Sequence, residues 1–346
     1  MNRIFLMGIV ALFFHGSLAA ETAVKYIHDW KWEGQAAPML MALDEGYFAD
    51  EGLDVSIEIG QGSVYAIPKV AAGEYEFGSA DINSLIKYLD KNPDAGLKGI
   101  FVVYNTPPFA IVGRRSQGVI GPADLQGRVL GAPAADGAFA QWKSFAHSSG
   151  IDADAVSIQD VGFPERETKL AEGEVDAVTG FSFSSLISLK AKGVPLADIS
   201  LMLMSDFGLD LYGNVLIVNP EFAENNPEAV RQFVSAATKG YLNCIANPAN
   251  AIKHVIARNE AADEEVELSR LIMAIGHHIV TPEVRQNGIG GLQFDRLERS
   301  IEQISRSYEF TRRPAATDVF DDSFLPDRSS RELLTAETQT AVAPPE

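Results

Sequence analysis

The sequence predicts an α/β protein made of two lobes, with mainly parallel sheets. From about residue 24 onward, short apolar runs alternate with helical stretches, which is the pattern of repeated strand–helix units. The chain has 346 residues, of which 46% are hydrophobic. This is long for one compact domain and supplies enough apolar material for two cores.

Five segments are predicted to be strands. The clearest is 54–59, where apolar and polar residues alternate with a period of two. The other four are short apolar runs at 99–104, 128–132, 156–161 and 214–218.

Helices are predicted between these strands and throughout the last third of the chain. One covers 38–45, with a proline in its first turn. Another covers 136–148, where Trp142 belongs to an apolar face that points to a core and Gly150 follows the end. After Pro220, helices are expected to follow one another at 227–245, 249–258, 263–275 and 294–308.

The two ends of the chain differ from the rest. Residues 1–20 have the three parts of a secretory signal peptide: Arg3, an apolar run at 4–14, and small residues before a cleavage site after Ala19 or Ala20. The apolar run is too short for a membrane anchor, which needs about 20 residues. We therefore expect a soluble, exported protein. Residues 327–346, with little apolar content, are expected to form a flexible tail.

Charge and cysteine content narrow the class of protein. The formal net charge is −19, from 47 acidic and 28 basic residues, and such a surface repels nucleic acid and anionic lipid. Cys244 is the single cysteine, so the chain forms no internal disulfide. It lies far from the position that a lipid anchor would need, and its apolar helical surroundings predict a buried small residue.

The sequence carries no recognisable catalytic motif. It lacks a G-x-S-x-G elbow, a Walker loop and an H-E-x-x-H pair. His277 and His278 are neighbours that would project about 100° apart on a helix, so their rings do not converge on one metal. We expect no catalytic residues, no metal and no cofactor.

Small and polar residues gather at three points where a predicted strand meets a helix, in 60–63, 79–83 and 132–138. Small residues let a ligand approach the backbone, and free N–H groups of a first helical turn hold an acceptor oxygen. Three of the acidic or hydroxyl side chains could instead be ordinary N-caps: Ser63, Asp81 and Asp136. The candidate ligand contacts at these junctions are Gln61, Gly62, Ser63, Asp81, Asn83, Asp136, Gly137 and Ala138.

Aromatic side chains supply further candidates. Trp30 and Trp32 lie in the polar loop 29–35. We favour Trp32, which lies close to Gln35, as a stacking wall for a flat ligand, and Trp30 as a core residue. The remaining candidates follow or end other strands: Tyr104, Phe163, Arg166 and Phe181.

Several segments resemble a known family. Residues 46–55, GYFADEGLDV, resemble the GYF-x-x-EGLDV signature of ABC-transporter solute-binding proteins of the nitrate/sulfonate/taurine and thiamine-precursor type. Three further segments are similar to other motifs of that family, in the same order and spacing: 71–78, 122–129 and 172–177. The resemblance covers about residues 24–310.

The resemblance implies a type II periplasmic-binding-protein fold, with two lobes, two crossover strands and a ligand in the cleft. The crossings would fall near 111–116 and 206–213. Lobe 1 would comprise 21–112 and 208–326, and lobe 2 would comprise 113–207. The three junctions would then face the cleft, two from lobe 1 and one from lobe 2. The implied protein is a periplasmic monomer that delivers its ligand to a permease with its ATPase.

The ligand class is predicted from the charges at these loops. Arg166 is the only basic residue there, whereas Asp81 and Asp136 disfavour a bare anion and favour an amine or an N–H-rich heterocycle. A pyrimidine related to thiamine is the favoured ligand, although residues 33–38 lack the histidine that pyrimidine-binding members commonly carry after the first tryptophan. Taurine, an alkanesulfonate or nitrate is the alternative. A thiamine-pyrimidine synthase-like enzyme, with a cysteine-rich motif and pyridoxal phosphate, is the remote one.

Overall fold

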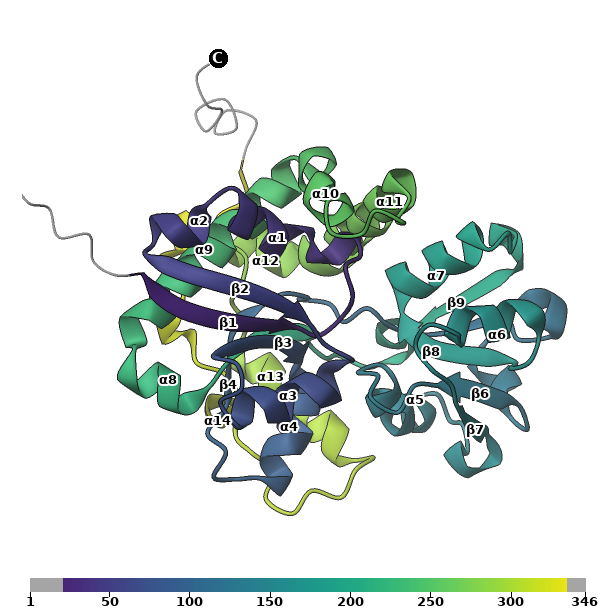
Figure 1. The fold of residues 1–346 in the computed structure, drawn as a ribbon. Helices are drawn as coiled ribbons and strands as arrows, with labels where there is room; N and C mark the ends of the chain where they lie inside the picture. Colours follow the sequence, from purple (N-terminus) through teal and green to yellow (C-terminus); the bar gives the residue numbers. More distant parts are fainter. Residues whose placement is uncertain (1–20, 335–346) are drawn as a thin grey trace, which may run out of the picture.

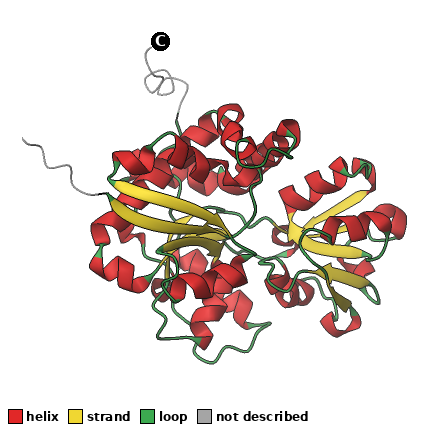
Figure 2. Cartoon of the chain, viewed as in Figure 1, coloured by secondary structure: helices red, strands yellow, loops and turns green. Residues whose placement is uncertain are grey.

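The computed structural model describes residues 21–334, which fold into two α/β lobes (Figures 1 and 2). The larger lobe, lobe 1, contains both ends of the described chain, and the smaller lobe 2 contains its middle part. The predicted signal peptide, residues 1–20, lies outside the described residues. Within 21–334 no helix is long and apolar enough to cross a membrane.

The sheet of lobe 1 has the strand order β2-β1-β3-β10-β4. β1 pairs in parallel with β2 and β3, whereas β10 runs antiparallel to both β3 and β4. The strands are β1 (Thr22–His28), β2 (Leu53–Ile59), β3 (Phe77–Asp81), β4 (Lys98–Val102) and β10 (Asn214–Val218).

The sheet of lobe 2 repeats this plan, with the order β7-β6-β8-β5-β9. β6 is parallel to β7 and β8, and β5 is antiparallel to β8 and β9. Each sheet is therefore mixed: four of its five strands run in the same direction, in line with the expectation of mainly parallel sheets, and the strand that first enters the lobe after a crossing runs opposite to them. The strands are β5 (Phe109–Arg114), β6 (Val129–Ala132), β7 (Ser157–Asp160), β8 (Ala177–Phe181) and β9 (Ile199–Leu203).

The chain crosses between the lobes twice. The first crossing is 103–108, between β4 and β5, and the second is 204–213, between β9 and β10. The first crossing precedes the predicted 111–116, so the first part of lobe 1 ends near 102 and not at 112. The reason is that the apolar run 109–113 is a buried central strand of the second sheet, paired on both sides.

Helices cover both faces of each sheet (Figure 1). The predicted helix 136–148 is shorter than expected, since only a 3₁₀ turn at Phe139–Gln141 precedes α5. Lobe 2 carries α5 (Trp142–Ser148), α6 (Arg166–Glu172) and α7 (Ser182–Ala191). Lobe 1 carries α1 (Ala37–Asp44), α2 (Tyr47–Asp50), α3 (Ser63–Ala71), α4 (Ile82–Lys91), α8 (Pro220–Asn225), α9 (Pro227–Ala246), α10 (Pro248–Ile256), α11 (Glu264–Ala274), α12 (Pro282–Asn287), α13 (Phe294–Ser305) and α14 (Ala316–Val319).

The long helix α9 anchors the core of lobe 1. Its buried Phe233 stacks on Phe77 of β3, with ring centroids 3.9 Å apart. Cys244, near the end of the same helix, is fully buried, which confirms the prediction of a small core residue. Trp142 of α5 is also a core residue, as its helical face predicted.

The start of the predicted flexible tail is ordered against lobe 1. The guanidinium of Arg331 donates hydrogen bonds to the carbonyl oxygens of Ile289 and Pro326, at 2.8 and 2.9 Å. Leu333 and Leu334 pack on the core of lobe 1. The prediction was therefore wrong for 327–334, where two leucines and an arginine find partners, and residues 335–346 lie outside the described residues.

Candidate functional site

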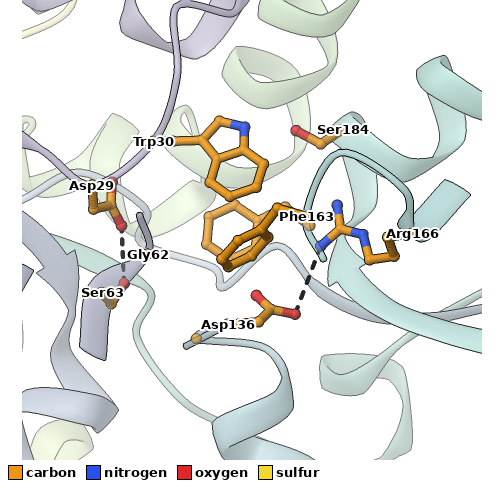
Figure 3. A pocket seen from close by; sticks show the side chains of 10 residues that line it. Asp29, Trp30, Gly62, Ser63, Asp136, Phe163, Arg166 and Ser184 are labelled. Carbon is orange, nitrogen blue, oxygen red and sulfur yellow. Dashed lines mark hydrogen bonds and ion pairs between the residues drawn. The ribbon is translucent and has the colours of Figure 1, made fainter. Parts of the chain in front are cut away.

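A small cavity of about 30 Å³, measured as the space open to the centre of a water molecule, lies where the two lobes meet (Figure 3). Lobe 1 contributes four residues to its wall and lobe 2 contributes six. The lining residues are Asp29, Trp30, Gly62 and Ser63 from lobe 1, and Asp136, Gly137, Phe163, Arg166, Phe181 and Ser184 from lobe 2.

The carboxyl ends of strands position these side chains. Asp29 follows β1, Gly62 and Ser63 follow β2, and Asp136 follows β6. Phe163 and Arg166 come after β7, and Ser184 stands in the first turn of α7, after β8. Parallel strands end at the same edge of a sheet, so this edge of each lobe gathers its loops around the cleft.

Aromatic rings from opposite lobes touch inside the cavity. Trp30 and Phe163 form a T-shaped pair with ring centroids 4.4 Å apart and planes at 76° (Figure 3). The guanidinium carbon of Arg166 lies 6.0 Å from the Trp30 ring and 5.9 Å from the Phe163 ring. Such a pair is in direct contact, so the lobes are closed on each other here.

Asp29 holds the strand ends of lobe 1 together. Its carboxylate accepts hydrogen bonds from the hydroxyl of Ser63 at 2.9 Å, the hydroxyl of Ser79 at 2.9 Å and the amide of Asn214 at 2.7 Å. Burial raises the pKa of Asp29, and these hydrogen bonds oppose the rise. Ser63 is therefore engaged in this network and is no N-cap, since Gly62 occupies the cap position of α3.

Asp136 and Arg166 form the corresponding charged cluster in lobe 2. Asp136 accepts a hydrogen bond from the Thr179 hydroxyl at 2.9 Å, and its Oδ2 lies 3.8 Å from Nη1 of Arg166. Arg166 also pairs with Glu167 at 2.7 Å. Burial alone would lower the pKa of Arg166, but the carboxylates of Glu167 and Asp136 outweigh it and raise this pKa. The positive charge is thus balanced inside the protein.

Two glycines allow the lobes to approach closely. A Cβ on Gly62, which has φ +96°, would lie 2.5 Å from the carbonyl oxygen of Ala135 in the opposite lobe. A Cβ on Gly137 would lie 3.1 Å from Cβ of Asp81. Gln141 of lobe 2 also donates a hydrogen bond to Asp81 at 3.1 Å. These contacts hold the rim of the cleft shut beside the cavity.

Seven of the fourteen predicted site residues line the cavity, and the structure brings them together from four separate loops or strand ends. They are Gly62, Ser63, Asp136, Gly137, Phe163, Arg166 and Phe181. Three others stand directly behind the wall or at the rim. Tyr104 packs edge-on against Phe181 at 6.1 Å, Ala138 is buried and donates its N–H to Asp136, and Asp81 caps α4 with its carboxylate while it binds Gln141.

The other four predicted residues lie away from the lining. Gln61 is exposed, and the side chain of Asn83 is buried, where it donates hydrogen bonds to Asp81 and the carbonyl of Tyr212. Gln35 is buried in the 3₁₀ turn Gly34–Ala36, and Trp32 stacks on His28 with ring centroids 6.0 Å apart.

The structure thus places Trp30, and not Trp32, on the cavity. Trp32 packs against the cluster formed by α1, α9, α10 and α11. The sequence could have pointed to Trp30 and Asp29 as site residues, because both directly follow the carboxyl end of β1. That strand was not predicted, so the strand-end rule was not applied there. Ser184 was missed although Phe181 at the end of β8 was a candidate, because Ser184 lies three residues further on, in the first turn of α7.

His278 connects the lobes near the first crossing. It is buried in a π-helical turn after α11, with Nδ1 3.2 Å from the carbonyl oxygen of Thr106 and Nε2 2.7 Å from the hydroxyl of Ser182. A carbonyl only accepts, so Nδ1 carries the proton and Ser182 donates to Nε2. Burial lowers the pKa of His278 to about 4. Within 21–334 no three His, Cys, Asp or Glu side chains gather as a metal site.

Known proteins share this fold. The structure matches the alkanesulfonate-binding protein SsuA of Xanthomonas axonopodis with a TM-score of 0.68 at 14% identity, over 87% of this chain and 99% of that one. It matches the periplasmic nitrate-binding protein NrtA of Synechocystis with a TM-score of 0.66 at 10% identity, over 88% and 87%. These likenesses confirm the predicted two-lobed periplasmic-binding-protein fold.

Two sequence relatives and one family model also match. The chain is 28% identical over 273 residues to the formylaminopyrimidine-binding protein of Halalkalibacterium halodurans, which covers 75% of this chain and 81% of the relative. It is 24% identical over 225 residues to the riboflavin-binding protein RibY of Chloroflexus aurantiacus, over 63% and 61%. The family described as NMT1/THI5 like matches residues 33–251, more than half of the chain. This protein therefore belongs to the NMT1/THI5-like family.

Proposed function

We propose that this chain is the solute-binding component of an ABC importer, and that its cleft takes a flat heterocycle of the pyrimidine class that carries N–H groups. The observation that carries the proposal is the make-up of the cavity wall. Aromatic rings and buried carboxylates line it, and the charge of Arg166 is already paired. The 28% identity to a formylaminopyrimidine-binding protein supports the same ligand class.

The chemistry of the wall favours N–H donors over anions. Carboxylates such as Asp136 only accept hydrogen bonds, so they suit an amino group or a ring N–H. A sulfonate or nitrate also brings only acceptors and would be repelled by Asp29 and Asp136. Arg166 is the one basic residue among those that line the cavity in the described chain, and its guanidinium serves Asp136 and Glu167.

Binding requires movement in the cleft. The Trp30–Phe163 contact leaves no room for a ring between the two side chains. A planar ligand therefore enters while the lobes are parted, or it moves Phe163 aside, and closure then buries it. The crossings 103–108 and 204–213 are the segments about which the lobes would hinge.

We infer that the protein binds its ligand without converting it. The synthase-like alternative depends on a cysteine-rich motif, whereas Cys244 is buried in α9, outside the cavity. In this proposal residues 1–20 direct export, the mature chain acts as a periplasmic monomer, and a permease with its ATPase receives the ligand.

A ligand screen tests the proposal. Residues 21–346 would be titrated by calorimetry with a formylaminopyrimidine, riboflavin, taurine, an alkanesulfonate and nitrate, and ligands would be recovered for mass analysis. A ligand at 100 times its Kd adds about 2.7 kcal/mol to the unfolding free energy, so thermal unfolding gives a second readout. We expect the pyrimidine to bind and to be recovered unchanged. Binding of the sulfonate or nitrate alone would refute the ligand class, and a converted pyrimidine would refute a pure binding role.

A further inference from the structure

One carboxylate beside the cavity contacts both lobes. Glu33 belongs to the loop after β1, and its Oε2 accepts hydrogen bonds from the indole Nε1 of Trp30 at 3.0 Å and from the hydroxyl of Ser184 at 3.0 Å. Trp30 is a wall of the cavity in lobe 1, and Ser184 is a wall in lobe 2. In Figure 3 the indole nitrogen of Trp30 lies on the side of its ring that faces Ser184.

Glu33 is surrounded by donors. Besides those two, Nε2 of Gln35 lies 3.4 Å and Nε of Arg270 lies 3.6 Å from its Oε2, and Nζ of Lys31 lies 3.1 Å from its Oε1. Only 5% of Glu33 is exposed. Burial alone would raise the pKa of Glu33, but the charges of Arg270 and Lys31, with the hydrogen bonds from Lys31 and Ser184, lower it. The Glu33 carboxylate is therefore kept ionised, and it is the hydrogen-bond acceptor or counter-charge for each of these neighbouring donors.

We propose that Glu33 is a positioning residue that couples the orientation of Trp30 to closure of the lobes. The same oxygen fixes the plane of the cavity wall and holds the opposite lobe through Ser184. When the lobes part, the hydrogen bond from Ser184 to Glu33 is lost. The Glu33 carboxylate is then held by fewer groups, so it fixes the indole of Trp30 less firmly. The ligand-binding part of this inference rests on the proposed function, whereas the closure part does not.

The matched control is Glu267 of α11. This carboxylate is equally buried, pairs with the same Arg270 and accepts the N–H of Gly34 at 2.7 Å. Its hydrogen bonds go neither to Trp30 nor to Ser184. Glu33→Gln and Glu267→Gln therefore remove the same charge from the same arginine, which donates to Ser188 of lobe 2 at 3.0 Å in the native protein, but only the first weakens the direct hydrogen bond from Ser184 to a lobe 1 carboxylate. A glutamine at position 33 also turns an N–H₂ group toward donors.

The first measurement needs no ligand. In a background in which Trp30 is the single tryptophan (Trp32→Phe, Trp142→Phe), acrylamide quenching reports the exposure of its indole, and small-angle X-ray scattering reports the radius of gyration. Glu33→Gln is expected to increase both quantities, and Glu267→Gln to leave both near those of the parent. Equal changes in the two variants, or none in Glu33→Gln, would overturn the proposal.

The second measurement uses a formylaminopyrimidine as probe in the otherwise native chain. A hydrogen bond to a charged group corresponds to a factor of about ten or more, so Glu33→Gln should raise Kd at least about tenfold, mainly through faster dissociation. If Glu33→Gln does not fold, Ser184→Ala decides: an unchanged dissociation rate and an unchanged radius of gyration would overturn the proposal. Failure of the probe to bind the parent protein would refute the ligand class and leave the ligand-free measurement to decide the role of Glu33.

Discussion

Replacing Trp30 by alanine removes the cavity wall that lobe 1 supplies. The indole contacts Phe163 at 4.4 Å between ring centroids, lies 6.0 Å from the guanidinium of Arg166 and donates a hydrogen bond to Glu33. Stacking of a heterocyclic base on an aromatic side chain is worth about 1–3 kcal/mol by alanine substitution. We therefore expect Trp30→Ala to raise the Kd for a formylaminopyrimidine about 5- to 160-fold in calorimetry at 25 °C.

Trp32→Ala is the control, because the same residue type two positions later packs on His28 and on the helices of lobe 1. It is half-buried, so its loss should lower the unfolding free energy in urea by about 2–3 kcal/mol, less than for a fully buried aromatic. Its effect on Kd should stay within about twofold. The reasoning is refuted if Trp32→Ala weakens binding as much as Trp30→Ala, or if Trp30→Ala leaves Kd unchanged.

Three further perturbations address closure, pH dependence and the buried ion pair. Gly137→Ala would place a carbon 3.1 Å from Cβ of Asp81 across the cleft, which should hold the lobes slightly apart and increase the protein's radius of gyration in small-angle X-ray scattering. Gly121→Ala is the control, because its added carbon would meet nothing within 4 Å, and its radius of gyration should match that of the parent protein. The pKa of His278 falls from 6.5 to about 4 on burial. Because the unfolded chain then binds the extra proton, the contribution of His278 to the unfolding free energy is fully present above pH 6.5 and falls by up to about 3 kcal/mol toward pH 4. His278→Gln should lose less over this range in urea titrations, and equal losses would contradict this origin. Arg166→Met leaves two buried carboxylates without a counter-charge and should lower the unfolding free energy by about 3–5 kcal/mol, and a loss below about 1 kcal/mol would contradict the pairing.

The regular elements could be predicted where the pattern is local. The alternation at 54–59 and the apolar run at 214–218 correspond to β2 and β10, and the helix predicted at 227–245 is α9 almost to the residue. Strands β1, β5 and β9 were not predicted, whereas β3 and β8 were inferred only as the strands that precede 79–83 and Phe181. β5 and β9 are almost wholly apolar, so they lack the alternation that marks a half-buried strand.

The candidate site could be predicted as far as strand ends were recognised. Small and polar residues after β2 and β6 gave Gly62, Ser63, Asp136 and Gly137, all of which line the cavity. Asp81 follows the same rule but caps its helix and binds Gln141 at the rim. The N-cap alternative was therefore right for this residue, and no sequence pattern separates a capping carboxylate from one that faces a cavity.

By itself, the sequence determined the α/β class, the helical last third and which loops carry polar and small residues, because periodicity, caps and turns depend on neighbours a few positions away. The tertiary structure decided that Trp30 rather than Trp32 faces the cleft, and that β5 and β10 are antiparallel to their neighbours. It also decided that Arg166 forms ion pairs with two carboxylates of the protein. Those outcomes depend on contacts between distant parts of the chain, such as the hydrogen bond between Glu33 and Ser184 across 151 positions. No local pattern encodes them, since they exist only once the lobes have formed and closed.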